Sequence, residues 1–181
     1  KFIPITCNKY DDGYGYSHSL NIHIPYMRLA GVYLMYAEAV AEGYGSPTAA
    51  VSSYGKTAVD AINVLRDRAG AGHVAAEFTG SLSAFMPELR RERAVELSFE
   101  GHRFNDLRRW LLLIKRPYTL KKTVYFDRVG TFSTTTPEDN AVKNLREETI
   151  LERKFTAKHY WLPLKTSDVT LYPGFTQNPG W

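Results

Sequence analysis

The stretch ELRRERAVELSFEGHRFNDLRRW, Glu88–Trp110, mixes charged and large apolar side chains more densely than the rest of the chain. Four of its glutamates recur at every fourth position: Glu88, Glu92, Glu96 and Glu100. On a helix this spacing forms one row of like charges that repel one another, so the row requires cations. The stretch contains them itself, as Arg90, Arg91, Arg93, Arg103, Arg108 and Arg109.

The residues next to Glu96 indicate that its carboxylate is buried. Its neighbours in sequence are mostly apolar, namely Ala94, Val95, Leu97 and Phe99. A buried carboxylate must be paired, or it becomes neutral. We predict a helix over about 85–100, a break at Gly101 and a second helix over about 102–113. Arg103 and Arg109 are then expected to fold back onto the glutamate row.

We interpret this stretch as a structural ion network that fixes how two helices cross. Its predicted members are Glu92, Arg93, Glu96, Glu100, Arg103 and Arg109. An acid–base site is the functional alternative, because perturbed carboxylates also mark active sites. That alternative would be a helical hydrolase that uses Glu96 or Glu100 with His102, and it requires a cleft at those residues.

The composition fits one domain with a real core. The chain has 181 residues, of which 44% are hydrophobic and 13% aromatic, with 12 tyrosines. Its net charge of +4 comes from basic residues interleaved with acidic ones, so a nucleic-acid partner is not indicated. The single cysteine, Cys7, excludes an internal disulfide framework and a multi-cysteine metal site. The sequence begins at Lys1 and not at Met, and we expect it to be part of a longer protein.

Residues 1–23 are predicted to form a loop rich in Gly, Asp, Asn, Ser and Tyr. Aromatic faces beside carboxylates suit stacking on sugar rings and other flat ligands. The candidate ligand-binding residues of this loop are therefore Tyr14 and Tyr16, with Asp11 and Asp12 as polar partners. The alternative is that these tyrosines only pack the loop onto a domain.

Helical hairpins are predicted over 24–114. Pro25 suits the first turn of a helix that runs to about Glu42, and we expect this helix to be buried on nearly all sides, because only Glu38 is charged between Leu29 and Ala41. A second helix is predicted to start at 46–48 and to end at Gly70. Stacked hairpins of this size resemble tetratricopeptide units.

Residues 115–181 are predicted to be mostly irregular and to pack on the helices. Residues 121–132 alternate apolar and polar side chains, which favours a short hairpin, whereas 131–144 are expected to form a polar surface loop. The later aromatic residues should hold the segment against the helical body: Tyr160, Trp161, Tyr172, Phe175 and Trp181.

No specific catalytic or metal-binding motif is present. The five histidines have no HExxH or similar ligand spacing, and GxSxG, Walker and GxGxxG motifs are absent. His18 and His23 share one loop, which is only weak evidence for a metal. We therefore expect no catalytic residue, no metal and no cofactor, and a protein that binds rather than catalyses.

Five segments, in this order, carry a resemblance to a known family: IPYMRLAGVYLMYAEAVAE, AINVLRDRAGAG, LRRERAVELSFEGHRFNDLRRW, HYWLPLKTSDV and the closing QNPGW. Together they resemble the C-terminal portion of the SusD/RagB family, the outer-membrane nutrient-binding lipoproteins of Bacteroidetes-type bacteria. The match covers about Pro25 to Trp181, with gaps.

The resemblance implies a SusD-like α/α superhelix of tetratricopeptide-like hairpins, within a single SusD-like C-terminal domain over 1–181. It implies no catalysis, but capture of a glycan or another nutrient at the outward face of the outer membrane. The partner would be a SusC-like TonB-dependent transporter barrel, and the membrane contact a lipid anchor on a cysteine other than Cys7. No ligand residue is carried across from the family. The alternative is a tetratricopeptide-like interaction module that binds a peptide or protein.

Overall fold

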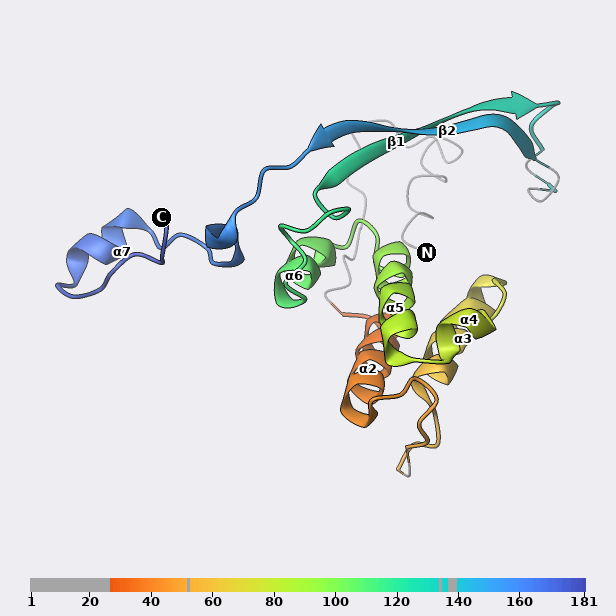
Figure 1. The fold of residues 1–181 in the computed structure, drawn as a ribbon, viewed down its shortest axis with the longest axis horizontal. Helices are drawn as coiled ribbons and strands as arrows, with labels where there is room; N and C mark the ends of the chain where they lie inside the picture. The colour runs from red at the N-terminus through yellow and green to blue at the C-terminus, as the bar shows by residue number, and fades with distance from the viewer. Residues whose placement is uncertain (1–26, 52, 134, 137–139) are drawn as a thin grey trace, which may run out of the picture. The chain divides into compact units, whose positions relative to one another are not determined.

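The computed structural model describes residues 27–51, 53–133, 135–136 and 140–181. These residues are mostly helical, with six α-helices, one short 3-10 helix and a two-stranded hairpin (Figure 1). The elements are α2 (Leu29–Tyr44), α3 (Ala58–Ala69), α4 (Ala76–Thr79), α5 (Leu82–Glu96), α6 (His102–Arg109), β1 (Leu120–Val129), β2 (Ala141–Glu152), η2 (Ala157–Tyr160) and α7 (Thr166–Leu171). The chain divides into two compact units, Lys1–Leu97 and Ser98–Trp181.

Helices α2, α3 and α5 build the core of the first unit. The buried cluster consists of Ala37, Val40, Ala41, Val51, Ala58, Ala61, Ile62, Val74, Phe85, Met86 and Leu89. Small residues on α2 and α3 allow these helices to approach closely, and Phe85 of α5 is fully buried in the same cluster. One face of α2 is left uncovered, since Leu29, Val32 and Met35 are 67%, 42% and 45% exposed. The prediction that this helix is buried on nearly all sides is therefore wrong.

The helix starts differ from the predicted ones for local reasons. Helix α2 begins at Leu29, because Arg28 has an extended backbone; Pro25, where we expected the start, lies outside the described residues. Helix α3 begins at Ala58, well after the predicted start at 46–48. Gly55 there adopts φ 72°, and Thr57 forms a capping box with Asp60. Those two side chains satisfy backbone donors that the first turn would otherwise leave unpaired.

Helix α5 ends earlier than predicted, at Glu96 and not near Glu100. Phe99 and Gly101 have φ values of 65° and 81°, a left-handed backbone that no α-helix can contain. The predicted break at Gly101 is confirmed, and α6 starts directly after it. Helices α5 and α6 belong to different units, so the predicted packing of one on the other stays a prediction.

Residues 115–181 are less irregular than predicted, because they contain a long antiparallel hairpin. The short hairpin predicted over 121–132 is wrong in extent, since most of these residues form one strand, β1, and the second strand lies at 141–152. Strand β1 pairs with β2 from Leu120 opposite Glu152 to Val129 opposite Ala141. The second strand of the hairpin, β2, is rich in charged residues, with three Glu, one Lys and one Arg. Glu and Lys have low β propensity, and opposite charges on the two strands compensate for it. Lys122 Nζ lies 2.6 Å from Glu147 Oε2. The loop expected over 131–144 is correspondingly shorter, because β2 begins at Ala141.

The chain end is fastened by the polar side chains of the closing QNPGW. Gln177 accepts a hydrogen bond from the Leu164 N–H at 2.8 Å and donates one to the Leu164 carbonyl at 2.9 Å. Asn178 donates to the carbonyl of Leu162, and the Trp181 indole donates to that of Lys158. Of the aromatic residues expected to hold this segment, four are exposed: Trp161, Tyr172, Phe175 and, despite its hydrogen bond, Trp181.

Candidate functional site

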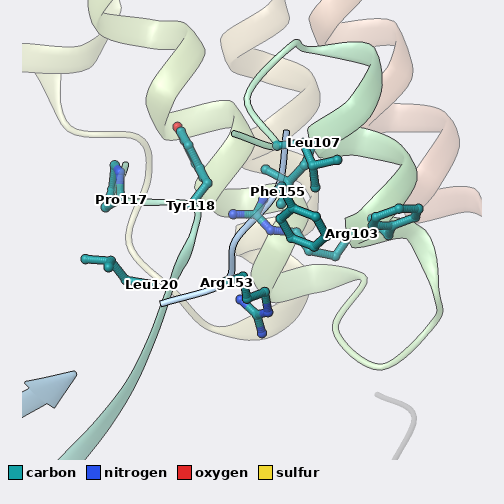
Figure 2. Close-up of a pocket in the computed structure, with 9 residues that line it drawn as sticks. Arg103, Leu107, Pro117, Tyr118, Leu120, Arg153 and Phe155 are labelled. Carbon is teal, nitrogen blue, oxygen red and sulfur yellow. The ribbon is translucent and has the colours of Figure 1, made fainter. Parts of the chain in front are cut away.

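The second unit contains a pocket of about 560 Å³ between α6, the connection to β1 and the chain that follows β2. Figure 2 shows the side chains that line it. Pockets that bind small molecules have volumes of about 300–1,000 Å³ and are mainly apolar with a few polar groups. The pocket fits this description in both respects.

Apolar side chains from each of these segments form most of the lining. They are Phe104, Leu107, Leu113, Pro117, Leu120 and Phe155. The rings of Phe104 and Phe155 lie 6.3 Å apart, with an angle of 47° between their planes. This contact joins α6 to the chain after β2, so the two aromatic residues also hold the pocket together.

Three polar side chains complete the lining: Arg103, Tyr118 and Arg153. The Arg103 guanidinium lies over the Tyr118 ring, 5.5 Å from its centre, which is a cation–π contact. The Arg153 backbone N–H donates to the Thr119 carbonyl at 2.8 Å, and this bond places the arginine at the pocket. Within the described residues, neither guanidinium has a hydrogen bond or an ion pair to the protein.

The acidic groups that adjoin the pocket in sequence are engaged elsewhere. Glu152 precedes Arg153, and its carboxylate receives two hydrogen bonds from Arg116, at 2.8 and 2.5 Å. These bonds hold the pKa of Glu152 below its ordinary value. On α6, Asp106 is bonded to Arg109 at 2.9 Å. The pocket therefore keeps two guanidinium charges that none of these carboxylates neutralises.

A smaller pocket of about 240 Å³ lies in the first unit, lined by Leu29, Val32, Tyr33, Tyr36 and Tyr54. The Tyr36 and Tyr54 rings meet edge to face, 5.2 Å apart, and the Tyr36 hydroxyl donates to the Lys56 carbonyl at 2.6 Å. A hydrogen bond with Tyr33 raises the pKa of Tyr54, and burial raises that of Tyr36. The three tyrosines form an aromatic surface beside Leu29 and Val32.

The predicted ion network is only partly made of the predicted residues. Three glutamates of the row, Glu88, Glu92 and Glu96, lie on α5 and face arginines from outside the stretch. Arg66 of α3 lies 2.5 Å from Glu88 and 2.8 Å from Glu92. Its side chain is 11% exposed, against 6% and 13% for the two glutamates.

Glu96 is held by two further arginines. Arg28 approaches its carboxylate at 2.6 Å and also donates to its backbone carbonyl, while Arg68 lies 2.7 Å away. Burial acts to raise the pKa of Glu96, but the hydrogen bonds from Arg28 and Arg68 outweigh it and leave the pKa lowered. An acid that donates a proton near neutral pH needs the opposite shift. Glu96 thus has the properties of a structural ion pair.

The other predicted members are Arg93, Glu100, Arg103 and Arg109. Arg93 is buried on α5, and Glu100 lies in the turn before α6. Arg109 is bonded to Asp106 of its own helix, and Arg103 lines the pocket. The expected contact of Arg103 and Arg109 with the glutamate row joins two units and stays a prediction.

The candidate ligand residues of the first loop, Tyr14, Tyr16, Asp11 and Asp12, lie outside the described residues. Sequence reasoning missed Tyr118, Arg153 and Phe155 as pocket residues. Arg153 and Phe155 lie more than 40 positions after α6, and none of the three residues shares a motif with it, so no local signal in the sequence groups them. In the part of the chain that the structure describes, no three His, Cys, Asp or Glu side chains are placed to hold a metal. No helix there has both the length and the apolar character to cross a membrane.

Comparison with known sequences decides the family. The sequence model of the SusD family matches residues 1–181, the whole chain. The chain belongs to the SusD family. The SusD fold is seen in a SusD-like protein (BF3747) from Bacteroides fragilis NCTC 9343, whose crystal structure matches with a TM-score of 0.64 at 23% identity. A second solved structure, named BT4246, matches with a TM-score of 0.56 at 26% identity.

The SusD likeness covers most of this chain but a minor part of the solved structures. The first alignment spans 92% of this chain and 28% of the Bacteroides fragilis chain. The second spans 86% of this chain and 23% of BT4246. No curated protein matches.

Proposed function

We propose that this SusD-family chain takes part in binding a nutrient, a glycan or oligosaccharide, at the bacterial cell surface. The protein would be lipid-anchored, face outward from the outer membrane and act with a SusC-like TonB-dependent transporter barrel. Family membership over residues 1–181 carries this proposal. No catalytic step is part of it.

The pocket of the second unit is the proposed sugar contact of this chain. Phe104 and Phe155 supply aromatic faces, on which the C–H faces of a sugar ring can pack. The polar groups at the same pocket can orient the ring, since its hydroxyls accept hydrogen bonds. The loop residues Tyr14 and Tyr16, with Asp11 and Asp12, remain a second proposed contact.

The helical scaffold supports the role of a rigid platform. Helices α2, α3 and α5 share one core, which agrees with the proposed tetratricopeptide-like arrangement of a SusD-like superhelix. The cluster of Arg28, Arg66 and Arg68 with the α5 glutamates fixes these helices. A single SusD-like domain over 1–181 is likewise proposed.

Calorimetric titration tests the proposal. The full-length protein is titrated with a panel of oligosaccharides and host glycans, with the 1–181 segment as a parallel sample. Phe155→Ala should weaken binding by about 1 kcal/mol or more if the ring stacks on a sugar. Phe126→Ala is the matched control, because Phe126 is an exposed ring on β1 outside the pocket. If no saccharide binds the full-length protein, the proposal is wrong.

An interaction module that binds a peptide or protein is the second candidate. Two features of the first unit favour it: the smaller pocket, which three tyrosines line, and the exposed face of α2. Replacement of Tyr33 by Ala separates the two candidates. It should leave sugar binding unchanged under our proposal and should abolish capture of a peptide partner under the second.

A further inference from the structure

We propose that the pocket of the second unit selects an anionic sugar, one whose ring carries a carboxylate or sulfate group. This inference rests on the proposed function and names the ligand class of its site. Two features of the pocket carry it: guanidinium groups without a protein counter-ion, and an aromatic lining that suits a ring.

The first feature is the pair of arginines. Arg103 and Arg153 come from α6 and from the chain after β2, 50 positions apart in sequence, and line the same pocket (Figure 2). Three other arginines of this unit are bonded to the protein: Arg108 to the Tyr160 carbonyl, Arg109 to Asp106 and Arg116 to Glu152. Arg128 and Arg146 on the hairpin have no such bond within the described residues, but they do not line this pocket. In the described residues, the guanidinium groups at the pocket form no such bond.

A guanidinium is a flat fork of N–H donors that matches the paired oxygens of a carboxylate or sulfate. Arg153 is held at the pocket through its own backbone, by the bond to the Thr119 carbonyl, so its side chain needs no other anchor. The Arg103 guanidinium lies over the Tyr118 ring, 5.5 Å from its centre, and this contact uses none of its N–H donors in a hydrogen bond. Both groups thus present donors to a ligand.

The second feature limits what the anion is attached to. An inorganic ion would use the arginines but not the apolar walls, which Phe104, Leu107 and Phe155 share. A neutral sugar would use the walls and leave the cations without a counter-charge. A sugar ring with one anionic substituent uses both, because its C–H faces meet the rings while its oxyanion meets the guanidinium forks.

The test compares ligands that differ only in charge. The full-length protein is titrated with a galacturonic acid trimer and with the same trimer after its carboxyl groups are reduced to hydroxymethyl groups. A trimer of galactose 6-sulfate forms a third arm and separates sulfate from carboxylate. We expect the acidic trimer, the sulfated trimer or both to bind at least tenfold more tightly than the reduced trimer, and the difference to shrink as salt is added.

Arginine variants assign that preference to the pocket. Arg103→Gln and Arg153→Gln should each weaken binding of the anionic trimer by about tenfold, the effect of losing one hydrogen-bonded charge contact, and leave the reduced trimer unaffected. Arg128→Gln makes the same charge change on β1, away from the pocket, and should change neither. Thermal melts of the variants verify that they are folded.

The outcomes separate the two proposals. Equal binding of anionic and reduced trimers, or an Arg103→Gln/Arg153→Gln double variant that binds the anionic trimer as the parent does, overturns the charge selection and leaves sugar binding intact. Absence of binding by every saccharide, neutral or charged, overturns the proposed function and the selection with it.

Discussion

Replacing Arg66 by Met tests whether the glutamate row is held by arginines from outside its own helix. Arg66 donates to the Glu88 carboxylate at 2.5 Å and to that of Glu92 at 2.8 and 3.0 Å. Methionine keeps much of the side-chain length and removes the charge. The side chains of Arg66, Glu88 and Glu92 are nearly buried. The change therefore leaves two carboxylates that have lost a hydrogen-bond donor and that water cannot readily reach.

The loss of unfolding free energy depends on which arginine each glutamate keeps after Arg66 is replaced. Breaking a buried ion pair costs about 3–5 kcal/mol. Glu88 keeps Arg91, whose bonds to it measure 2.8 and 2.5 Å, whereas Glu92 keeps Arg91 only at 4.0 Å. The loss therefore falls mainly on Glu92, at the low end of the range, about 3 kcal/mol. For a chain of this size that corresponds to a fall in Tm of roughly 6–12 °C.

Arg68→Met is the matched control on the same helix. Arg68 also bonds a glutamate of α5, but its side chain is 50% exposed, and exposed ion pairs contribute about 0–1 kcal/mol. Thermal and urea unfolding of both variants, followed by circular dichroism, gives the two free energies. Equal losses in the two variants, or a Tm for Arg66→Met within error of the parent, would refute the argument from burial.

Three further predictions concern the same unit. Glu96→Ala should lower stability by about 2–3 kcal/mol in urea unfolding, because it removes the carboxylate that bonds Arg28; a change under 0.5 kcal/mol contradicts it. Thr57→Ala should cost about 1 kcal/mol through loss of the α3 cap to Asp60, and no fall in Tm would rule out that cap. The hydrogen bond from Arg91 holds the pKa of Glu88 below 4.5, so the ionised Glu88 stabilises the fold fully above that pH, and this stabilisation is lost as the pH falls through the folded pKa. Tm measured against pH should fall in this acidic range, and the fall should be smaller in Glu88→Gln.

The sequence predicts the helical part of the fold best where a glycine ends or separates helices. Gly70 was expected to end a helix and does, and Gly101 was expected to separate two helices and does. The start of α3 was missed although Thr57 and Asp60 have the spacing of a capping box. Ser46-Pro47 favours an earlier helix start, since proline also suits a first turn.

The sequence favours a short hairpin over 121–132 but gives no sign of the second strand, β2, because the composition of β2 disfavours a strand. Residues 141–152 are rich in charged side chains that disfavour strands, and only their pairing with β1 makes them a strand. Lys122 with Glu147, and Arg146 over the Tyr125 ring at 4.8 Å, are cross-strand contacts between residues more than 20 positions apart. The alternation of polar and apolar residues along one segment cannot reveal such contacts between segments.

The site was predicted less well than the fold. The sequence predicts that Arg103 belongs to an ion network, because a row of glutamates precedes it in the chain. The structure puts Arg103 at a pocket with Arg153 and Tyr118. That grouping depends on the path of the chain through β1 and β2, which no local motif encodes.

A crystal structure of the full-length protein with its tightest-binding oligosaccharide tests the central claim most directly. We expect a sugar ring against Phe104 and Phe155, with its anionic group between Arg103 and Arg153. A sugar that contacts none of these residues, with the pocket filled by another part of the protein, would contradict it. In that case this chain contributes scaffold and not the binding site.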